Sequence, residues 1–327
     1  MPQGEVFMPR HALHGIIAPT VSPMNAAGTL DRSSLERHLT TLIDAGVHGL
    51  WINGTTGEFH ALDHEERTLA VAVAAKTAGG RIPVIAHVGD AATASTVRHA
   101  LAAVDAGADE IAVIAPYFAG YGREELRDHY RAVARAVGFP VIAYHMPQLT
   151  RSALTVDCVL DLTREGVLRG IKDSAGDMTW LRQLLNRLDR HGLDLRCFTG
   201  GSSLTDLSLY AGAAGATSSL ANVTPRHLVA LYEAARSGDW PRARMLQEQL
   251  EELLDLMRAA RREPTLSAIV STFKFVLAAL GRIDDAHAAD PLARPDAEER
   301  RRLAATVVPR VRELEAAAHA KERGHDS

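Results

Sequence analysis

Lys172 is the residue best placed for amine chemistry, because it ends a short apolar run, LRGIKDS, that is typical of a strand. The chain has only three other lysines, Lys76, Lys274 and Lys321, and arginine stays protonated and cannot act as an amine nucleophile. Burial lowers the pKa of a lysine, and the neutral amine can attack a ketone and form an imine. The alternative is that Lys172 reaches solvent or pairs with Asp173. Lys274, in the helical C-terminal part, is expected to cap a helix or form an ion pair.

Two further strand ends carry groups that suit the same chemistry. Tyr144 ends the run PVIAYHMP, and its phenol could relay a proton to or from the carbon chain of a substrate. The run NGTTGEF places Gly54, Thr55 and Thr56 after another strand, where hydroxyls and free backbone N–H groups suit a carboxylate. The alternatives are a core tyrosine with a locally satisfied hydroxyl and a turn that only ends its strand.

No motif for metal or phosphate chemistry stands out. The fifteen histidines are scattered without an HExxH pattern or a Cys/His cluster, and neither a GxSxG motif nor a phosphate-binding loop occurs. His87 and His145 end two predicted strands and are expected to face the site. Each could bind a substrate hydroxyl or could be a polar side chain satisfied within the protein.

The elements that must position these residues alternate regularly along the chain. Eight continuous apolar runs are typical of parallel strands covered on both faces. They span residues 15–20, 48–54, 83–89, 110–116, 140–147, 168–174, 195–201 and 215–221. Helical segments lie between them, with starts at Asp31, Asp63 and Thr93 and stops at glycines. Eight strand–helix units over residues 1–238 predict a (β/α)8 barrel, a TIM barrel. The alternative, a doubly wound open sheet, would usually place a glycine-rich turn after the first strand, and none is present.

Residues 239–327 predict three further helices with no linker before them, so we expect a helical extension packed on the barrel, with a polar tail from about residue 318. Because a barrel of this type gathers its site at the carboxyl ends of its strands, the ends of the seventh and eighth strands should line the same pocket. The candidates there are Gly200, Ser202, Ser203, Thr217 and Ser218.

The motifs GIIAPTVSP, NGTTGEF, APYF, AYHMP, GIKDS and SSLANVTP occur in this order, with 28 residues from Tyr144 to Lys172. Over residues 13 to about 280 this combination resembles the dihydrodipicolinate synthase / N-acetylneuraminate lyase superfamily. The resemblance implies a Schiff base on Lys172, acid–base catalysis by Tyr144, and binding of a 2-oxo-acid carboxylate by Thr55 and Thr56. It also implies a homotetramer, built as a dimer of dimers, and no metal or organic cofactor.

Two departures from the family pattern concern the substrate. Dihydrodipicolinate synthases have an arginine two residues after the proline of Y-x-x-P, where this chain has Leu149 and then Arg151 two residues later. Neuraminate lyases have acidic residues after the seventh strand, where this chain has Ser202 and Ser203 in the run TGGSS. These differences argue against both of those substrates. The run PQLT is more similar to the neuraminate lyase and 2-oxo-3-deoxy-sugar-acid aldolase branches, so the resemblance favours a 2-oxo-3-deoxy sugar acid.

A third departure concerns proton transfer. In the family a relay tyrosine is contributed across the dimer interface after the fourth strand, and this chain has Phe118 at that position. Phenylalanine cannot relay a proton, so Tyr117, Tyr121 or water would have to replace it.

The resulting hypothesis is a class I lyase that cleaves or condenses pyruvate or another 2-oxo acid with an aldehyde. Three alternatives stay open: a dehydratase or hydratase-aldolase that uses the same imine, 4-hydroxy-tetrahydrodipicolinate synthase, and a catalytically silent protein that binds a 2-oxo acid. The candidate catalytic residues are Lys172 and Tyr144. The candidate substrate-binding residues are Gly54, Thr55, Thr56, Phe118, His145, Gly200, Ser202, Ser203, Thr217 and Ser218.

The bulk composition limits the partners. A net charge of -4 gives no reason to expect nucleic acid or an acidic membrane surface, and no apolar run approaches the length of a membrane span. The N-terminal run MPQGEVFMPRHAL lacks the apolar segment of a signal peptide, so we expect a cytoplasmic protein.

Overall fold

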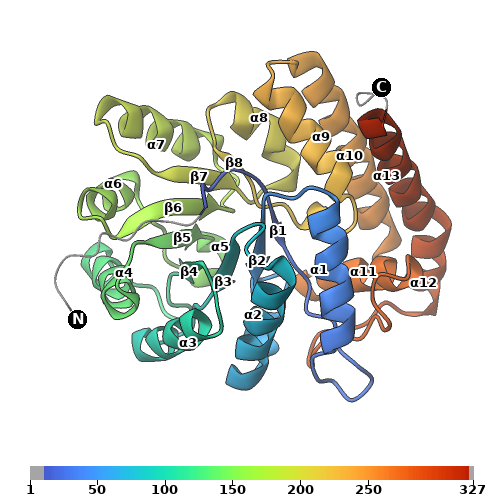
Figure 1. Ribbon diagram of the computed structural model, residues 1–327, viewed down its shortest axis with the longest axis horizontal. Helices are drawn as coiled ribbons and strands as arrows, with labels where there is room; N and C mark the ends of the chain where they lie inside the picture. The colour runs from blue at the N-terminus through green and yellow to red at the C-terminus, as the bar shows by residue number, and fades with distance from the viewer. Residues whose placement is uncertain (1–10, 324–327) are drawn as a thin grey trace.

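The chain folds into a closed barrel of eight parallel strands that follow one another in chain order (Figure 1). The computed structural model describes residues 11–323. The strands are β1 Gly15–Pro19, β2 Gly49–Ile52, β3 Val84–His87, β4 Glu110–Ile114, β5 Val141–His145, β6 Leu168–Asp173, β7 Arg196–Thr199 and β8 Gly215–Ala216. The predicted (β/α)8 barrel is therefore confirmed.

A layer of helices surrounds the barrel, as the alternating pattern predicts. The helices that follow the strands are α1 Arg32–Asp44, α2 His64–Ala78, α3 Thr93–Asp105, α4 Arg123–Val137, α6 Val156–Arg164, α7 Met178–Arg190, α8 Thr205–Tyr210 and α9 Pro225–Arg236. Asp31 and Asp63 cap α1 and α2 through their carboxylates. The predicted cap at Thr93 is wrong, because Thr93 is the first helical residue and its hydroxyl lies 2.9 Å from His129 Nδ1.

Strand β8 is much shorter than the predicted 215–221, because the chain turns away after two residues. Gly215 lies so close to β1 that a Cβ there would be 2.0 Å from the carbonyl oxygen of Gly15. The following turn brings in Asn222, whose amide donates to the carbonyl of Pro19 at 2.9 Å and accepts from the N–H of Val21 at 3.1 Å. One buried amide thus joins the turn after the last strand, β8, to the end of the first strand, β1.

The strands separate two apolar cores, because successive side chains point to opposite faces of a sheet. The larger core lies between the barrel and the helices. The smaller core fills the barrel interior and consists of Leu13, Ile17, Trp51, Ile85, Ala112, Ile114, Ile142, Tyr144 and Phe198. Tyr144 and Trp51 are the largest side chains of this inner core, and both lie toward the end of the barrel where the candidate residues gather.

Three helical segments follow the barrel, as predicted, and the first and third of them pack on α9 (Figure 1, orange to red). They are α10 Trp240–Ala260, α11 Leu266–Ala279 and a long third segment, α12 Ala297–Arg302 and α13 Val308–Arg323, joined by a π-helical turn. The third segment stays helical to Arg323, so most of the tail predicted from residue 318 is helix.

The predictions for residues 1–10 and 324–327 lie outside the described residues. Within the described residues, no helix is long and apolar enough to cross a membrane.

A fully buried ion pair joins this extension to the loop after β2. Glu58 and Lys274 are both 0% exposed, and the Lys274 ammonium contacts the Glu58 carboxylate and donates to the carbonyl of His287 at 2.8 Å. The other Glu58 oxygen accepts from the N–H of Ala289 at 2.7 Å. Burial raises the pKa of Glu58 and lowers that of Lys274, and their mutual attraction opposes both shifts. The ion pair expected for Lys274 is present, and it anchors the loop that carries Thr55 and Thr56.

Removal of one member of this pair should destabilise the fold strongly. We expect Lys274→Met to lower the free energy of unfolding by about 3–5 kcal/mol, because it leaves a carboxylate buried without its partner. Urea unfolding followed by circular dichroism would measure this, with exposed Lys76→Met as the control that should change stability by less than about 0.5 kcal/mol. Equal unfolding midpoints for the two variants would contradict the expectation.

Candidate active site

Lys172 and Tyr144 are neighbours on adjacent strands, and both point into the barrel. The register of β5 and β6 pairs Tyr144 directly with Lys172, so the two side chains leave the sheet on the same face. The amine of Lys172 lies 4.2 Å from the centre of the Tyr144 ring. Both side chains are buried, with 5% and 2% of their surface exposed. The amine and the phenol predicted to act together are thus brought into contact.

The environment of Lys172 favours the neutral amine. Burial lowers its pKa from 10.5 to about 7, and no acidic group contributes to the shift. The neighbouring Asp173 points to the opposite face of β6, where its carboxylate lies 2.9 Å from His145 Nδ1. Lys172 therefore neither reaches solvent nor pairs with Asp173, the two alternatives that the sequence leaves open. A neutral amine near pH 7 is a competent nucleophile.

The loop after β2 brings a hydroxyl to the phenol. Thr55 Oγ1 lies 3.0 Å from Tyr144 Oη, and both groups are buried. Thr56 is half-buried on the same loop. Burial raises the pKa of Tyr144, while hydrogen bonds from Thr55 and Ser174 oppose that shift. The phenol stays protonated at neutral pH and has a hydrogen-bonding route toward the loop.

Gly200 at the end of β7 lets that strand approach Lys172. A Cβ at this position would lie 3.1 Å from Lys172 Cε and 2.0 Å from Ser174 Oγ. Beyond it, Ser202 Oγ and Ser218 Oγ lie 2.8 Å apart, so the ends of β7 and β8 share a hydroxyl pair. Ser203 turns away and donates to Glu251 of α10 at 3.0 Å.

Thr217, directly after β8, is buried, and its hydroxyl has no hydrogen-bond partner among the described residues. It lies on the same segment as Ser218. A buried hydroxyl that lacks a partner costs free energy unless a ligand or water satisfies it.

The two strand-end histidines differ in position. His87 points inward, with its ring centre 5.7 Å from that of Tyr144, and burial lowers its pKa to about 3, so it is neutral. Its Nδ1 lies 2.8 Å from the carbonyl oxygen of Asn53 and must donate, which leaves Nε2 as an acceptor.

The expectation that His145 faces the same pocket is wrong. It lies one residue after Tyr144, on the outer face of β5, and its ring packs on Trp180 of α7 at 4.6 Å.

A cavity of about 200 Å³ opens beside Thr55 at the mouth of the barrel. Its lining is mostly apolar and consists of Thr55, Phe59, His60, Ile114, Tyr117, Leu149, Thr150 and Leu266. Leu149 is held there by the short helix α5, Pro147–Thr150. Leu266 comes from the first turn of α11, so the C-terminal extension forms part of this wall. Arg151 does not line the cavity.

The aromatic residues after β4 take different positions. Phe118 is 89% exposed and has a left-handed backbone with φ of 85°, so within one chain it lies outside the cavity. Tyr117 lines the cavity, and its hydroxyl interacts with Arg67 and Asp90. Tyr121 packs against the outer core, and its backbone N–H donates to Ser152. Of the two tyrosines that could replace a relay at position 118, only Tyr117 lies beside Thr55.

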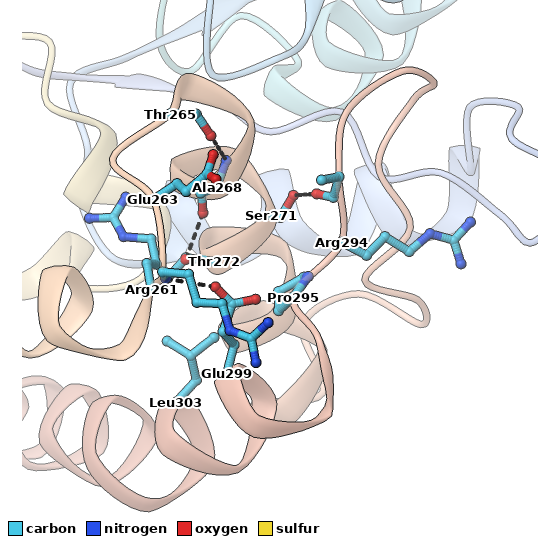
Figure 2. A pocket seen from close by; sticks show the side chains of 12 residues that line it. Arg261, Glu263, Thr265, Ala268, Ser271, Thr272, Arg294, Pro295, Glu299 and Leu303 are labelled. Carbon is cyan, nitrogen blue, oxygen red and sulfur yellow. Dashed lines mark hydrogen bonds between the residues drawn. The ribbon is translucent and has the colours of Figure 1, made fainter.

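A second cavity, of about 250 Å³, lies in the C-terminal extension between α11 and α12 (Figure 2). It contains none of the candidate residues, and its Arg262 is paired with Asp296 at 2.9 Å. Among the described residues, no group of three or more His, Cys, Asp or Glu side chains is placed to hold a metal ion.

Sequence reasoning missed Trp51, which forms one side of the lysine site. Its ring centre lies 4.8 Å from Lys172 Nζ, and the side chain is buried. The run HGLWING is apolar at successive positions, so the sequence contains no alternation that would assign Trp51 to the inner face. Leu266 was also missed, because a contact between the extension and the barrel mouth leaves no local pattern in the sequence.

The closed barrel and the polar groups at its carboxyl end define a (β/α)8 protein with its site at the usual place in that fold. Residues 12–309 match the family model described as the dihydrodipicolinate synthetase family, and the chain belongs to this family. An uncharacterized DapA-like lyase of Halobacterium salinarum is 37% identical over 272 residues, which cover 80% of this chain and 87% of the relative. The 4-hydroxy-tetrahydrodipicolinate synthase 1 of Streptomyces coelicolor is 36% identical over 262 residues, 80% of this chain and 82% of that protein.

Solved structures agree with this assignment. YagE, a prophage protein of the dihydrodipicolinic acid synthase family from E. coli K12, was crystallised in complex with pyruvate. It matches this chain with a TM-score of 0.84 and 28% identity, over 93% of this chain and 99% of YagE. The likeness covers the barrel and most of the C-terminal extension.

The pKa of Lys172 predicts how its reactivity depends on pH. We expect reductive methylation of Lys172 by formaldehyde and cyanoborohydride to accelerate as pH rises toward about 7 and to level off above it, because only the neutral amine reacts. Mass spectrometry of the Lys172 peptide would follow the rate. In urea-unfolded protein the rise should move toward the ordinary pKa of 10.5. Coincident profiles for the folded and unfolded chains would contradict a buried, deprotonated amine.

Proposed function

We propose that the protein is a class I lyase in which Lys172 forms an imine with pyruvate or a related 2-oxo acid. The observation that carries the proposal is the buried amine of Lys172, which contacts Tyr144 while the Tyr144 phenol lies 3.0 Å from Thr55. An amine, a proton carrier and a carboxylate-binding loop in contact with one another are the groups that imine chemistry requires. Membership of a family whose relatives are named lyases and synthases supports the same conclusion.

The proposed reaction begins when the neutral amine of Lys172 attacks the carbonyl carbon of the 2-oxo acid. Tyr144 donates a proton to the oxygen, water leaves and a protonated imine remains. The loop at Thr55 and Thr56 holds the carboxylate.

For cleavage, a base removes the proton of the substrate C4 hydroxyl, the C3–C4 bond breaks and the aldehyde leaves. The iminium accepts the electron pair as an enamine, which is then protonated at C3 and hydrolysed to pyruvate. Condensation is the reverse. No metal or organic cofactor is required, because the imine itself is the electron acceptor.

Two features support an uncharged, hydroxylated aldehyde, as in a 2-oxo-3-deoxy sugar acid. Ser202 and Ser218 offer hydroxyls at the ends of β7 and β8. Leu149 lines the cavity in place of a cation that could bind a second carboxylate. The exposed Phe118, held in a left-handed conformation, supports contact with another subunit. The homotetramer that we propose rests on membership of the family alone. The cytoplasmic location stays a prediction.

Trapping of the imine tests the proposal directly. We expect incubation with pyruvate and borohydride to add one reduced pyruvate to Lys172, detected by mass spectrometry of the peptide that contains it. Lys172→Ala should abolish the adduct, whereas Lys76→Ala should not change it. If pyruvate and a panel of longer 2-oxo acids all leave Lys172 unmodified, the proposed function is wrong.

Removal of the phenol should separate binding from proton transfer. We expect Tyr144→Phe to lower kcat for aldol cleavage by about 10²–10⁴-fold, the range for a positioned acid or base. The change in KM should be smaller, since the ring that packs on Lys172 is retained. Steady-state kinetics with the aldehyde product measured would check this. A Tyr144→Phe enzyme with the wild-type kcat would exclude the phenol as proton carrier.

A further inference from the structure

Trp51 and Tyr144 surround the amine of Lys172 with aromatic faces. Trp51 comes from β2 and Tyr144 from β5, and their ring centres lie 4.8 and 4.2 Å from Lys172 Nζ. The two rings meet edge to face at 5.7 Å. Both are buried in the inner core of the barrel, so water does not screen an interaction between these rings and a charge on the nitrogen. Aromatic faces attract cations most strongly when the cation is desolvated.

The imine that Lys172 forms would be a cation without a carboxylate partner from the protein. The nearest acidic residue in sequence, Asp173, is on the other face of β6 and binds His145 and the N–H of Ala175. His87 of β3 faces the barrel interior beside Trp51 and Tyr144, and it is neutral. The positive charge must therefore be balanced by the substrate carboxylate and by the aromatic faces.

The position of Trp51 fits such a role. Its indole edge packs against Gly54, where a Cβ would lie 2.9 Å from Trp51 Nε1, so the ring is wedged between the carboxylate-binding loop and the lysine. Its Nε1–H has no hydrogen-bond partner among the described residues. Packing rather than a hydrogen bond fixes this indole, and its face is turned to the lysine nitrogen.

We propose that Trp51 is a catalytic residue whose indole face stabilises the positively charged imine on Lys172. This inference rests on the proposed function. It goes further by identifying an aromatic side chain as the group that stabilises the positive charge of the intermediate. It also predicts selection of 2-oxo acids over simple ketones, because only a substrate with its own carboxylate completes the charge balance in the barrel.

The equilibrium of imine formation tests the proposal. We expect Trp51→Leu, which keeps an apolar side chain but removes the aromatic face, to lower the fraction of Lys172 trapped at subsaturating pyruvate by about tenfold. Trp51→Phe, which keeps a smaller face, should lie between Trp51→Leu and the wild type. The control is Trp180→Phe, which removes an indole outside the barrel and should leave trapping unchanged. Equal trapping in Trp51→Leu and the wild type would overturn the role of Trp51.

Fluorescence gives a second readout that leaves Trp51 itself in place and tests whether its indole contacts the adduct. The chain has three tryptophans, so Trp180→Phe with Trp240→Phe leaves Trp51 as the single fluorophore. We expect pyruvate to quench its emission in proportion to the trapped adduct, and Lys172→Ala to abolish the quenching. Adduct formation without a change in Trp51 emission would overturn the inference even if Trp51→Leu fails to fold. Absence of any adduct in the wild type would instead show that the proposed function itself is wrong.

Discussion

The candidate site depends on the removal of one lysine amine from water. Burial of an ammonium without a carboxylate partner costs free energy. This cost lowers the pKa of Lys172 to about 7, so the neutral amine is well populated near that pH. Everything that surrounds the nitrogen contributes to this. The register of β5 and β6 turns Lys172 inward, the packed inner core excludes water from the nitrogen, and Gly200 allows β7 to close on the side chain. A carboxylate on the inner face would raise the pKa of the amine, and strand alternation places Asp173 on the outer face, where His145 and the N–H of Ala175 bind it.

The C-terminal extension is part of the site rather than an addition to a finished barrel. Glu58 follows Thr55 by three residues and has a left-handed backbone, which a non-glycine residue adopts only when its surroundings impose it. Those surroundings are Lys274 on α11 and the N–H of Ala289, both supplied by the extension. The same helix contributes Leu266 to the cavity beside Thr55. The loop expected to hold the substrate carboxylate therefore takes its shape from residues more than two hundred positions later in the chain.

The sequence predicted the architecture and the placement of Lys172 beside Tyr144, because both depend on signals that are local or repeated. Eight apolar runs separated by capped helices indicate a barrel, and a strand-end lysine is recognisable from its short context. The sequence did not show on which face of the sheet a side chain lies, because strands that are buried on both faces lack an alternation of apolar and polar residues. That is why His145 was expected in the pocket and Trp51 was overlooked. The length of β8 was overestimated because its end is determined by contact with Gly15 and by Asn222, which no nearby residue reveals.

Closure of the barrel through Asn222 also constrains how the protein can form during synthesis. The first strand finds its second neighbour, β8, only after some two hundred further residues have left the ribosome, because Asn222 bonds to Pro19 and Val21. Until then β1 presents an unpaired strand edge, the kind of surface on which nascent chains associate wrongly. Lys274 and Ala289 emerge later still, so the contacts that hold Glu58 form only after every strand has been made. A chain released before residue 274 would contain every strand of the barrel and yet leave the Glu58 carboxylate without either partner.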